Sequence, residues 1–130
     1  MAERIDLEVP ATRNALSTVR MVLGGLGARL DFSLDDLEDL YLATDELLRT
    51  ALDADALDRW SVEMLVDAGV LRFAAGTFKS AKLRADVSIH AEDCLDLCML
   101  LRRTVDDVVF EDDGGAYRIV LVKRRKGGPA

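Results

Sequence analysis

The sequence predicts an α+β fold, a two-layer sandwich in which three helices cover one face of a mixed, mostly antiparallel sheet. Three observations predict it. Residues 5–9, Ile-Asp-Leu-Glu-Val, alternate between apolar and acidic side chains, which is the period of a half-buried strand. Two pairs of β-favouring runs each flank a glycine-containing turn, as in a β-hairpin. Three further segments repeat apolar residues at three- and four-residue steps, the period of a helix face. The predicted order of elements is therefore β-α-α-β-β-α-β-β.

The first helix is predicted to begin after the first strand, with Thr12 or Asn14 as its N-cap. Three glycines follow in residues 24–27, and each costs a helix interior about 1 kcal/mol relative to alanine. A phosphate-binding glycine loop normally follows a strand, whereas this one follows a helix. We therefore interpret these glycines as sites of close packing or of helix termination.

The second helix is the segment around which the chain is organised. Ser33 can accept hydrogen bonds from the free amides at its start, and the helical pattern runs to about Leu52. Glu46 and Thr50 lie off the apolar stripe, and because they are four residues apart they face the same pocket or solvent. A carboxylate and a hydroxyl so placed could serve chemistry, although a solvated helix carboxylate is the simpler interpretation of Glu46. The apolar stripe itself comprises Leu37, Leu40, Tyr41, Thr44, Leu47, Leu48, Ala51 and Leu52.

Two hairpins account for the remaining strands. Residues 61–66 and 70–74 flank a turn that contains Gly69. Residues 107–111 and 116–122 flank the pair Gly114-Gly115, which is the clearest turn signal in the chain.

Between the hairpins, the irregular residues 75–90 predict a loop or a lid-like connection. The third helix is predicted to begin near Ala91 and to continue to about Val105. Its two cysteines, Cys94 and Cys98, lack the second Cys or His pair of a zinc site. We expect them to be small buried hydrophobic residues.

The composition suits one compact domain, predicted to span residues 1–123, with a basic and glycine-rich tail over residues 124–130. The formal charge of −7 argues against direct nucleic-acid binding and suits a basic or mixed-charge protein partner. The sequence has neither a signal-peptide pattern nor an apolar run of membrane-spanning length. We therefore expect a cytoplasmic protein without a membrane partner.

Three stretches of the chain carry a resemblance to a known family. Residues 7–20 look like the family's first strand and helix, residues 40–51 like its nucleotide-site helix, and residues 100–123 like its final helix and hairpin. In their order and spacing they resemble the bacterial anti-sigma-factor serine kinases, a branch of the histidine-kinase-like (GHKL) ATPases. The resemblance implies the histidine-kinase-like ATPase fold over nearly the whole chain.

The resemblance assigns Glu46 and Thr50 to the nucleotide site. In the family, a Glu on the second helix activates the attacking hydroxyl or water, and an Asn four residues later holds Mg²⁺. Glu46 matches the Glu, whereas Thr50 stands at the Asn position. A threonine hydroxyl has a shorter reach than the amide, and Mg²⁺ requires near-ideal octahedral geometry.

The other nucleotide motifs of the family are degraded. Its Asp-x-Gly-x-Gly motif holds adenine, and here Ala74 stands at the Asp position, Gly76 is kept, and Phe78 replaces the second glycine. Its Gly-x-Gly motif cradles phosphates, and here Leu95 and Leu97 replace both glycines. The resemblance thus implies a degenerate member with a vestigial nucleotide site, for which no cofactor is expected.

The resemblance also implies what the protein binds. The expected function is that of an anti-sigma-factor-like regulator that binds a stress- or sporulation-type sigma factor, with a competing anti-anti-sigma protein of the STAS type. Arg20 matches an arginine that contacts both partners in the family, and Arg13 and Arg29 are further surface candidates. A homodimer formed through the first strand and helix is expected as well.

Two alternatives remain open from the sequence. The first is an active but divergent protein-serine kinase that acts on an anti-anti-sigma protein, with Glu46 as base and with ATP held through Mg²⁺ at Thr50. The sequence alone leaves open whether the protein is an enzyme. The second is a sensory or structural module whose pocket is lined by Leu47, Ala74, Phe78 and Leu97.

Overall fold

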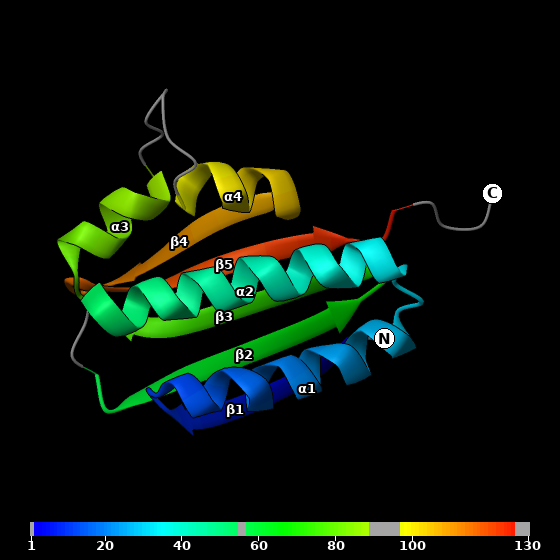
Figure 1. Ribbon diagram of the computed structural model, residues 1–130, viewed down its shortest axis with the longest axis horizontal. Coiled ribbons are helices and arrows are strands. Elements are labelled where there is room, and N and C mark those ends of the chain that lie inside the picture. The colour runs from blue at the N-terminus through cyan, green and yellow to red at the C-terminus, as the bar shows by residue number, and fades with distance from the viewer. Residues whose placement is uncertain (1, 55–56, 89–96, 127–130) are drawn as a thin grey trace.

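The computed structural model describes residues 2–54, 57–88 and 97–126 and confirms the α+β two-layer sandwich (Figure 1). The described residues form five strands and four helices. The strands are β1 (Glu3–Pro10), β2 (Arg59–Asp67), β3 (Val70–Phe78), β4 (Asp107–Asp113) and β5 (Ala116–Arg124). The helices are α1 (Arg13–Arg29), α2 (Leu34–Ala54), α3 (Ala81–Ser88) and α4 (Leu97–Thr104).

All neighbouring strands of the sheet pair antiparallel, in the order β1-β2-β3-β5-β4. The sheet is therefore antiparallel throughout, whereas the sequence predicted a mixed one. Both predicted hairpins are confirmed. Their turns use positive φ angles, at Gly69 in the β2–β3 hairpin and at Gly114 and Gly115 in the β4–β5 hairpin, a conformation that glycine adopts at little cost.

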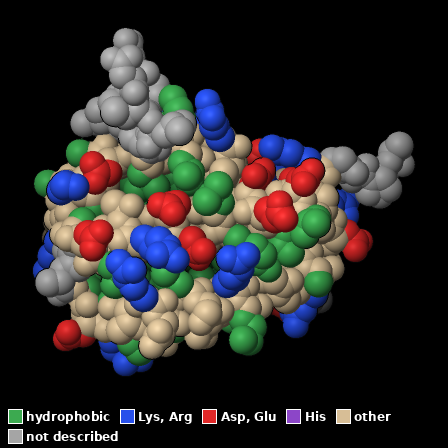
Figure 2. Space-filling model, in the orientation of Figure 1, with side chains coloured by type: hydrophobic (Ala, Val, Ile, Leu, Met, Phe, Trp, Pro, Cys, Tyr) green, Lys and Arg blue, Asp and Glu red, His purple; other side chains and the backbone are tan. Residues whose placement is uncertain are grey.

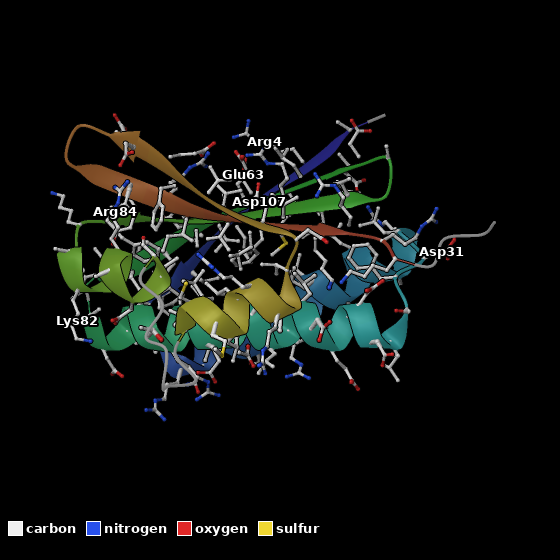
Figure 3. The ribbon with its side chains drawn as sticks, turned by 90° about the horizontal axis from the view of Figure 1, so that it is seen from above. Arg4, Asp31, Glu63, Lys82, Arg84 and Asp107 are labelled. Atoms are coloured by element: carbon white, nitrogen blue, oxygen red, sulfur yellow. The ribbon has the colours of Figure 1, made fainter. Side chains whose placement is uncertain are left out.

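The helices cover one face of the sheet, and the core lies between the two layers (Figures 1 and 3). The largest fully buried side chains include Trp60, Phe73, Phe78, Leu23 and Leu47. The opposite face of the sheet carries charged side chains, among them Arg4 and Glu63, whose Nη2 and Oε2 atoms lie 2.9 Å apart (Figure 3).

Two of the three glycines of α1, Gly24 and Gly27, allow close packing against α2, as one of the two sequence interpretations predicts. A Cβ atom on Gly24 would lie 2.6 Å from the hydroxyl oxygen of Tyr41, and one on Gly27 would lie 2.6 Å from Cδ1 of Leu37. The alternative of helix termination at the glycines is wrong, because α1 continues to Arg29.

The predicted loop over residues 75–90 is wrong over its described part, residues 75–88. Strand β3 continues to Phe78, and α3 occupies residues 81–88. Ser80 caps the start of α3, since its hydroxyl oxygen accepts a hydrogen bond of 3.1 Å from the backbone amide of Leu83. Leu83 and Val87, four residues apart, are its buried residues. The predicted helix start near Ala91, Cys94 and the tail end 127–130 lie outside the described residues.

Helix α3 is tied to the second hairpin by Arg84. Its guanidinium group donates hydrogen bonds to the carboxylate of Asp112, and its Cζ atom lies 4.5 Å from the ring centroid of Phe110. Tyr117 donates its hydroxyl proton to the carbonyl oxygen of Ser80. These tertiary contacts therefore stabilise α3, which is too short to be stable on its own.

None of the helices formed by the described residues has the length and apolarity that crossing a membrane requires.

Candidate functional site

Glu46 and Thr50, the polar residues predicted to form a site on α2, lie on one side of that helix. Asp39 precedes Glu46 by seven residues, which places the two on the same helix side, and Oδ2 of Asp39 lies 3.5 Å from Nζ of Lys123 in β5. Both Glu46 and Thr50 are half-buried. The hydroxyl of Thr50 donates a hydrogen bond of 2.8 Å to the carbonyl oxygen of Glu46, one turn earlier in the helix. This bond holds the Thr50 hydroxyl against its own backbone.

Strand β3 places Ala74 and Phe78 on opposite faces of the sheet. Ala74 packs against Val120 and Val122 on the face away from the helices. Phe78 is fully buried in the core below the helices, and its ring centroid lies 6.0 Å from that of Tyr117. Only Phe78 therefore shares a side of the sheet with α2.

Gly76 is explained by packing between two strands. A Cβ atom at this position would lie 3.0 Å from the carbonyl oxygen of Tyr117 and 3.2 Å from Cα of Arg118. The register between β3 and β5 shifts between Ala75 and Phe78, which brings the two backbones close together at Gly76.

Leu97 is the first residue of α4 and packs, half-buried, against the core. Leu95 lies outside the described residues. As placed, Thr50, Ala74 and Phe78 do not supply the set of ligands that the resemblance assigns to Mg²⁺ and adenine. Thr50 bonds to its own helix, Ala74 faces the other side of the sheet, and the Phe78 ring fills space inside the core.

A second set of polar residues lies in the groove between α1 and α2, centred on Arg20. The Cζ atom of Arg20 lies 4.2 Å from the ring centroid of Tyr41, within the range of a cation–π contact. Its Nη1 atom lies 3.6 Å from Oδ2 of Asp45. Arg20 remains 55% exposed. The structure therefore presents this guanidinium group on an aromatic support, where a partner can reach it.

Two hollows adjoin Arg20. The first, of about 220 Å³, is lined by Arg13, Leu16, Ser17, Arg20, Asp45 and Arg49, and we call it the arginine hollow. The second, of about 350 Å³, is lined by Arg20, Glu38, Tyr41, Leu42 and Asp45, and we call it the tyrosine hollow. The predicted partner-binding residues Arg13 and Arg20 thus line one hollow, whereas Arg29 is paired with Glu3 of β1.

The arginine hollow is locally positive although the whole chain carries a charge of −7. Its lining includes three arginines, Arg13, Arg20 and Arg49, and one acidic residue, Asp45. Basic and acidic side chains alternate over this helical face (Figure 2). A locally positive hollow attracts anionic groups even when the net charge is negative, because only charges within about 10 Å act strongly at moderate salt.

Sequence reasoning missed Tyr41, Asp45 and Arg49 as parts of a surface site. The sequence pattern places Tyr41 in the buried stripe, because a tyrosine ring is apolar. Their spacing could have indicated the site, because residues 41, 45 and 49 follow one another at four-residue steps and so lie along one side of α2.

Known proteins share part of this sequence. The serine-protein kinase RsbW of Bacillus velezensis is 32% identical over 66 residues, which are 51% of this chain and 41% of that protein. RsbW of Bacillus thuringiensis is 32% identical over 44 residues, 34% of this chain and 28% of that protein. The chain is similar to the RsbW serine-protein kinases. The matched segments span less than half the length of these RsbW proteins, and no family model matches the chain.

A solved structure shares the fold. The crystal structure of the RsbU and RsbW domains of Rv1364c from Mycobacterium tuberculosis superposes with a TM-score of 0.61 at 17% identity, covering 94% of this chain and 32% of that one. This match shows that the chain shares its fold with part of that structure, in agreement with the fold that the resemblance implies. The sequence similarity to RsbW serine-protein kinases supports the predicted resemblance to the anti-sigma-factor serine kinases.

Proposed function

We propose that this protein is an anti-sigma-factor-like regulator that binds a stress- or sporulation-type sigma factor through the surface around Arg20. Sequestration of this kind requires a complementary surface and no chemical step. The observation that carries the proposal is the presentation of Arg20, which is 55% exposed and lies over the ring of Tyr41 in a groove between two helices. Arginine and tyrosine are enriched among the residues that dominate binding energy at protein interfaces.

The proposal includes a degenerate nucleotide site that is not needed for binding. The placements of Thr50, Ala74 and Phe78 support it, since these residues do not surround one cavity with Glu46. A competing STAS-type anti-anti-sigma protein and a homodimer, both implied by the resemblance, belong to the same proposal.

The second candidate is a divergent protein-serine kinase. The similarity to RsbW serine-protein kinases and the half-buried carboxylate of Glu46 favour it. It requires Mg²⁺ and ATP beside Glu46, and the hydrogen bond from Thr50 to its own helix argues against that arrangement.

The experiment is a binding screen. The purified chain is immobilised, and each sigma factor of the host is tested by biolayer interferometry without nucleotide. We expect one alternative sigma factor to bind, and its affinity to be the same when Mg²⁺-ATP is added. A screen in which no host sigma factor binds contradicts the proposed function.

A further inference from the structure

Strand β4 is an edge of the sheet. Among the described strands it pairs with β5 alone, so the backbone groups on its outer side meet no neighbouring strand. The amide of Val108 lies on this outer side, because it donates a hydrogen bond of 2.9 Å to Oδ1 of Asp107 in its own strand. Backbone groups of an antiparallel strand alternate between its two sides, so those of Phe110 and Asp112 also point outward. An edge of this kind is a template for a further strand.

A hollow adjoins this edge on the side of the helices. It has a volume of about 330 Å³ and is lined by residues of α3, α4 and β4, which lie together at this side of the sheet (Figure 1). We call it the edge hollow. Side chains of a strand project alternately to its two faces, so every second side chain of an added strand would lie beside Val108 and Phe110, next to this hollow. Its apolar lining consists of Val87, Cys98, Val105, Val108 and Phe110.

The other face of β4 carries carboxylates. Val109 lies on this face, because its partner residue in β5 packs on the side of the sheet away from the helices. By alternation, Asp107, Glu111 and Asp113 share the face with Val109. Glu111 is ion-paired with arginines of β3 and β5. Among the described residues, the structure pairs no cation with Asp107 or Asp113, which are exposed and stand at the two ends of the seven-residue strand.

Charge complementarity identifies the chemistry of the partner. A lysine or arginine at each end of an added seven-residue strand would lie opposite Asp107 and Asp113, and opposite charges across a strand pair stabilise it. Arg102 lines the edge hollow together with Asp106 and Asp107, so the helix side carries no excess of positive charge. A second copy of β4 fits poorly. An antiparallel pair of β4 strands centred on Phe110 would place Asp107 opposite Asp113 of the copy, and like charges so placed are destabilising.

We infer that β4 binds an extended segment of a partner protein as a sixth strand of the sheet, with basic side chains opposite Asp107 and Asp113 and apolar side chains beside the edge hollow. This surface is separate from the one around Arg20, because α1 lies over β1 and β2, at the opposite edge of the sheet (Figure 1). The chain therefore has surfaces for two partners at once. The inference goes beyond the proposed function and does not depend on it.

The test uses the full chain and fluorescent heptapeptides, with binding measured by anisotropy at increasing salt. The parent probe is Lys-Val-Thr-Val-Thr-Val-Lys, which places its lysines opposite Asp107 and Asp113 and its valines beside the edge hollow. A second probe has glutamate in place of both lysines. We expect the lysine peptide to bind in a salt-dependent manner and the glutamate peptide to bind about tenfold more weakly.

Two N-methylated versions of the lysine peptide test whether it binds as a strand. One carries N-methyl groups on its three valines, and the other carries them on both threonines and the last lysine. Only one alternate set of amides in an added strand points toward β4. We therefore expect one version to bind like the parent peptide and the other, which loses three hydrogen bonds, to bind about tenfold more weakly.

Variants of the chain assign the binding to β4. Val109 is 38% exposed and lies between the two end carboxylates, so Val109→Lys should weaken binding of the lysine peptide by about threefold. The matched control Met21→Lys makes the same charge change on an exposed apolar side chain of α1, at the other edge of the sheet. It should leave the affinity nearly unchanged.

Equal binding of the lysine and glutamate peptides overturns the inference, as does equal binding of the two N-methylated versions. A Val109→Lys variant that binds the lysine peptide as well as Met21→Lys does also overturns it. Size-exclusion chromatography tests the other occupant of the edge. If the parent chain is a dimer and Val109→Lys is a monomer, a second copy occupies β4 and the inference is wrong.

Discussion

The ammonium group of Lys123 donates a hydrogen bond of 2.7 Å to the carbonyl oxygen of Thr104 inside the protein, where Lys123 has no exposed surface. The same group lies 3.8 Å from Oδ1 of Asp36 and 3.5 Å from Oδ2 of Asp39. Asp36 also accepts a hydrogen bond from the backbone amide of Lys126. One buried cation thus joins the end of β5, the end of α4 and the first turns of α2.

Replacing this lysine should destabilise the fold. In Lys123→Met, the buried Asp36 loses its cation, and the Thr104 carbonyl loses its donor. Breaking a buried pair in this way costs about 3 kcal/mol of unfolding free energy, which urea denaturation measures. Lys126→Met is the control, because Lys126 contacts Asp36 through its backbone amide, which this substitution keeps. Similar stabilities of the two variants would show that the buried cation does not join these elements.

Two adjacent glycines of α1 should respond differently to alanine. A Cβ atom on Gly25 would meet no packing neighbour within 4 Å among the described residues, so Gly25→Ala should raise the unfolding free energy by about 0.5–1 kcal/mol. At Gly24 the same methyl group would lie 2.6 Å from the Tyr41 hydroxyl. Gly24→Ala should gain less stability or lose some, because the Tyr41 ring must move. Equal gains in urea denaturation would refute the close packing of α1 against Tyr41.

The contact between α3 and the second hairpin should depend on pH. The hydrogen bond from Arg84 holds the pKa of Asp112 below its ordinary value of 3.8, against a smaller opposing effect of desolvation. Since the folded state has the lower pKa, Asp112 stabilises the fold at pH values above 3.8 and loses this contribution as the pH falls through the lowered pKa. Asp112→Asn should therefore be less stable than the parent at neutral pH, and the difference should disappear in acid.

Urea denaturation over a pH series measures this difference. Asp113→Asn removes the same charge one residue away and is the matched control. If both variants show the same pH dependence, the ion pair of Arg84 and Asp112 does not explain it.

Nucleotide should not stabilise the protein. A ligand that binds only the folded state raises the melting temperature, and the effect grows with its concentration. Because Thr50, Ala74 and Phe78 do not surround one site with Glu46, we expect no thermal shift with millimolar Mg²⁺-ATP. A concentration-dependent shift that Glu46→Gln or Thr50→Ala abolishes would instead support the kinase alternative.

The sequence predicted most of the fold because the signals for its main elements are local. The turns at Gly69 and Gly114 need positive φ angles, and the apolar stripe of α2 is long enough to be unambiguous. Helix α3 was missed because it has only eight residues and two buried side chains. Its stability comes from Arg84 and its contacts with β4, which sequence spacing does not reveal.

The candidate site was predicted in part. The resemblance identified Arg20 and Arg13, and the structure places both in the arginine hollow. It did not identify Tyr41, since an aromatic ring in a helical stripe looks like core. The position of Ala74 could not be predicted either, because the register shift between Ala75 and Phe78 changes how motif positions relate to the faces of the sheet.

If Arg20 is the main contact with a sigma factor, titration calorimetry of that complex measures its contribution. The parent chain is compared with Arg20→Ala and with Arg103→Ala, which removes an exposed arginine from α4. We predict that Arg20→Ala weakens the complex by at least about 2 kcal/mol, as loss of a dominant interface residue does, while Arg103→Ala leaves the affinity unchanged. Equal affinities of the parent chain and Arg20→Ala for the sigma factor would show that Arg20 is not a main contact.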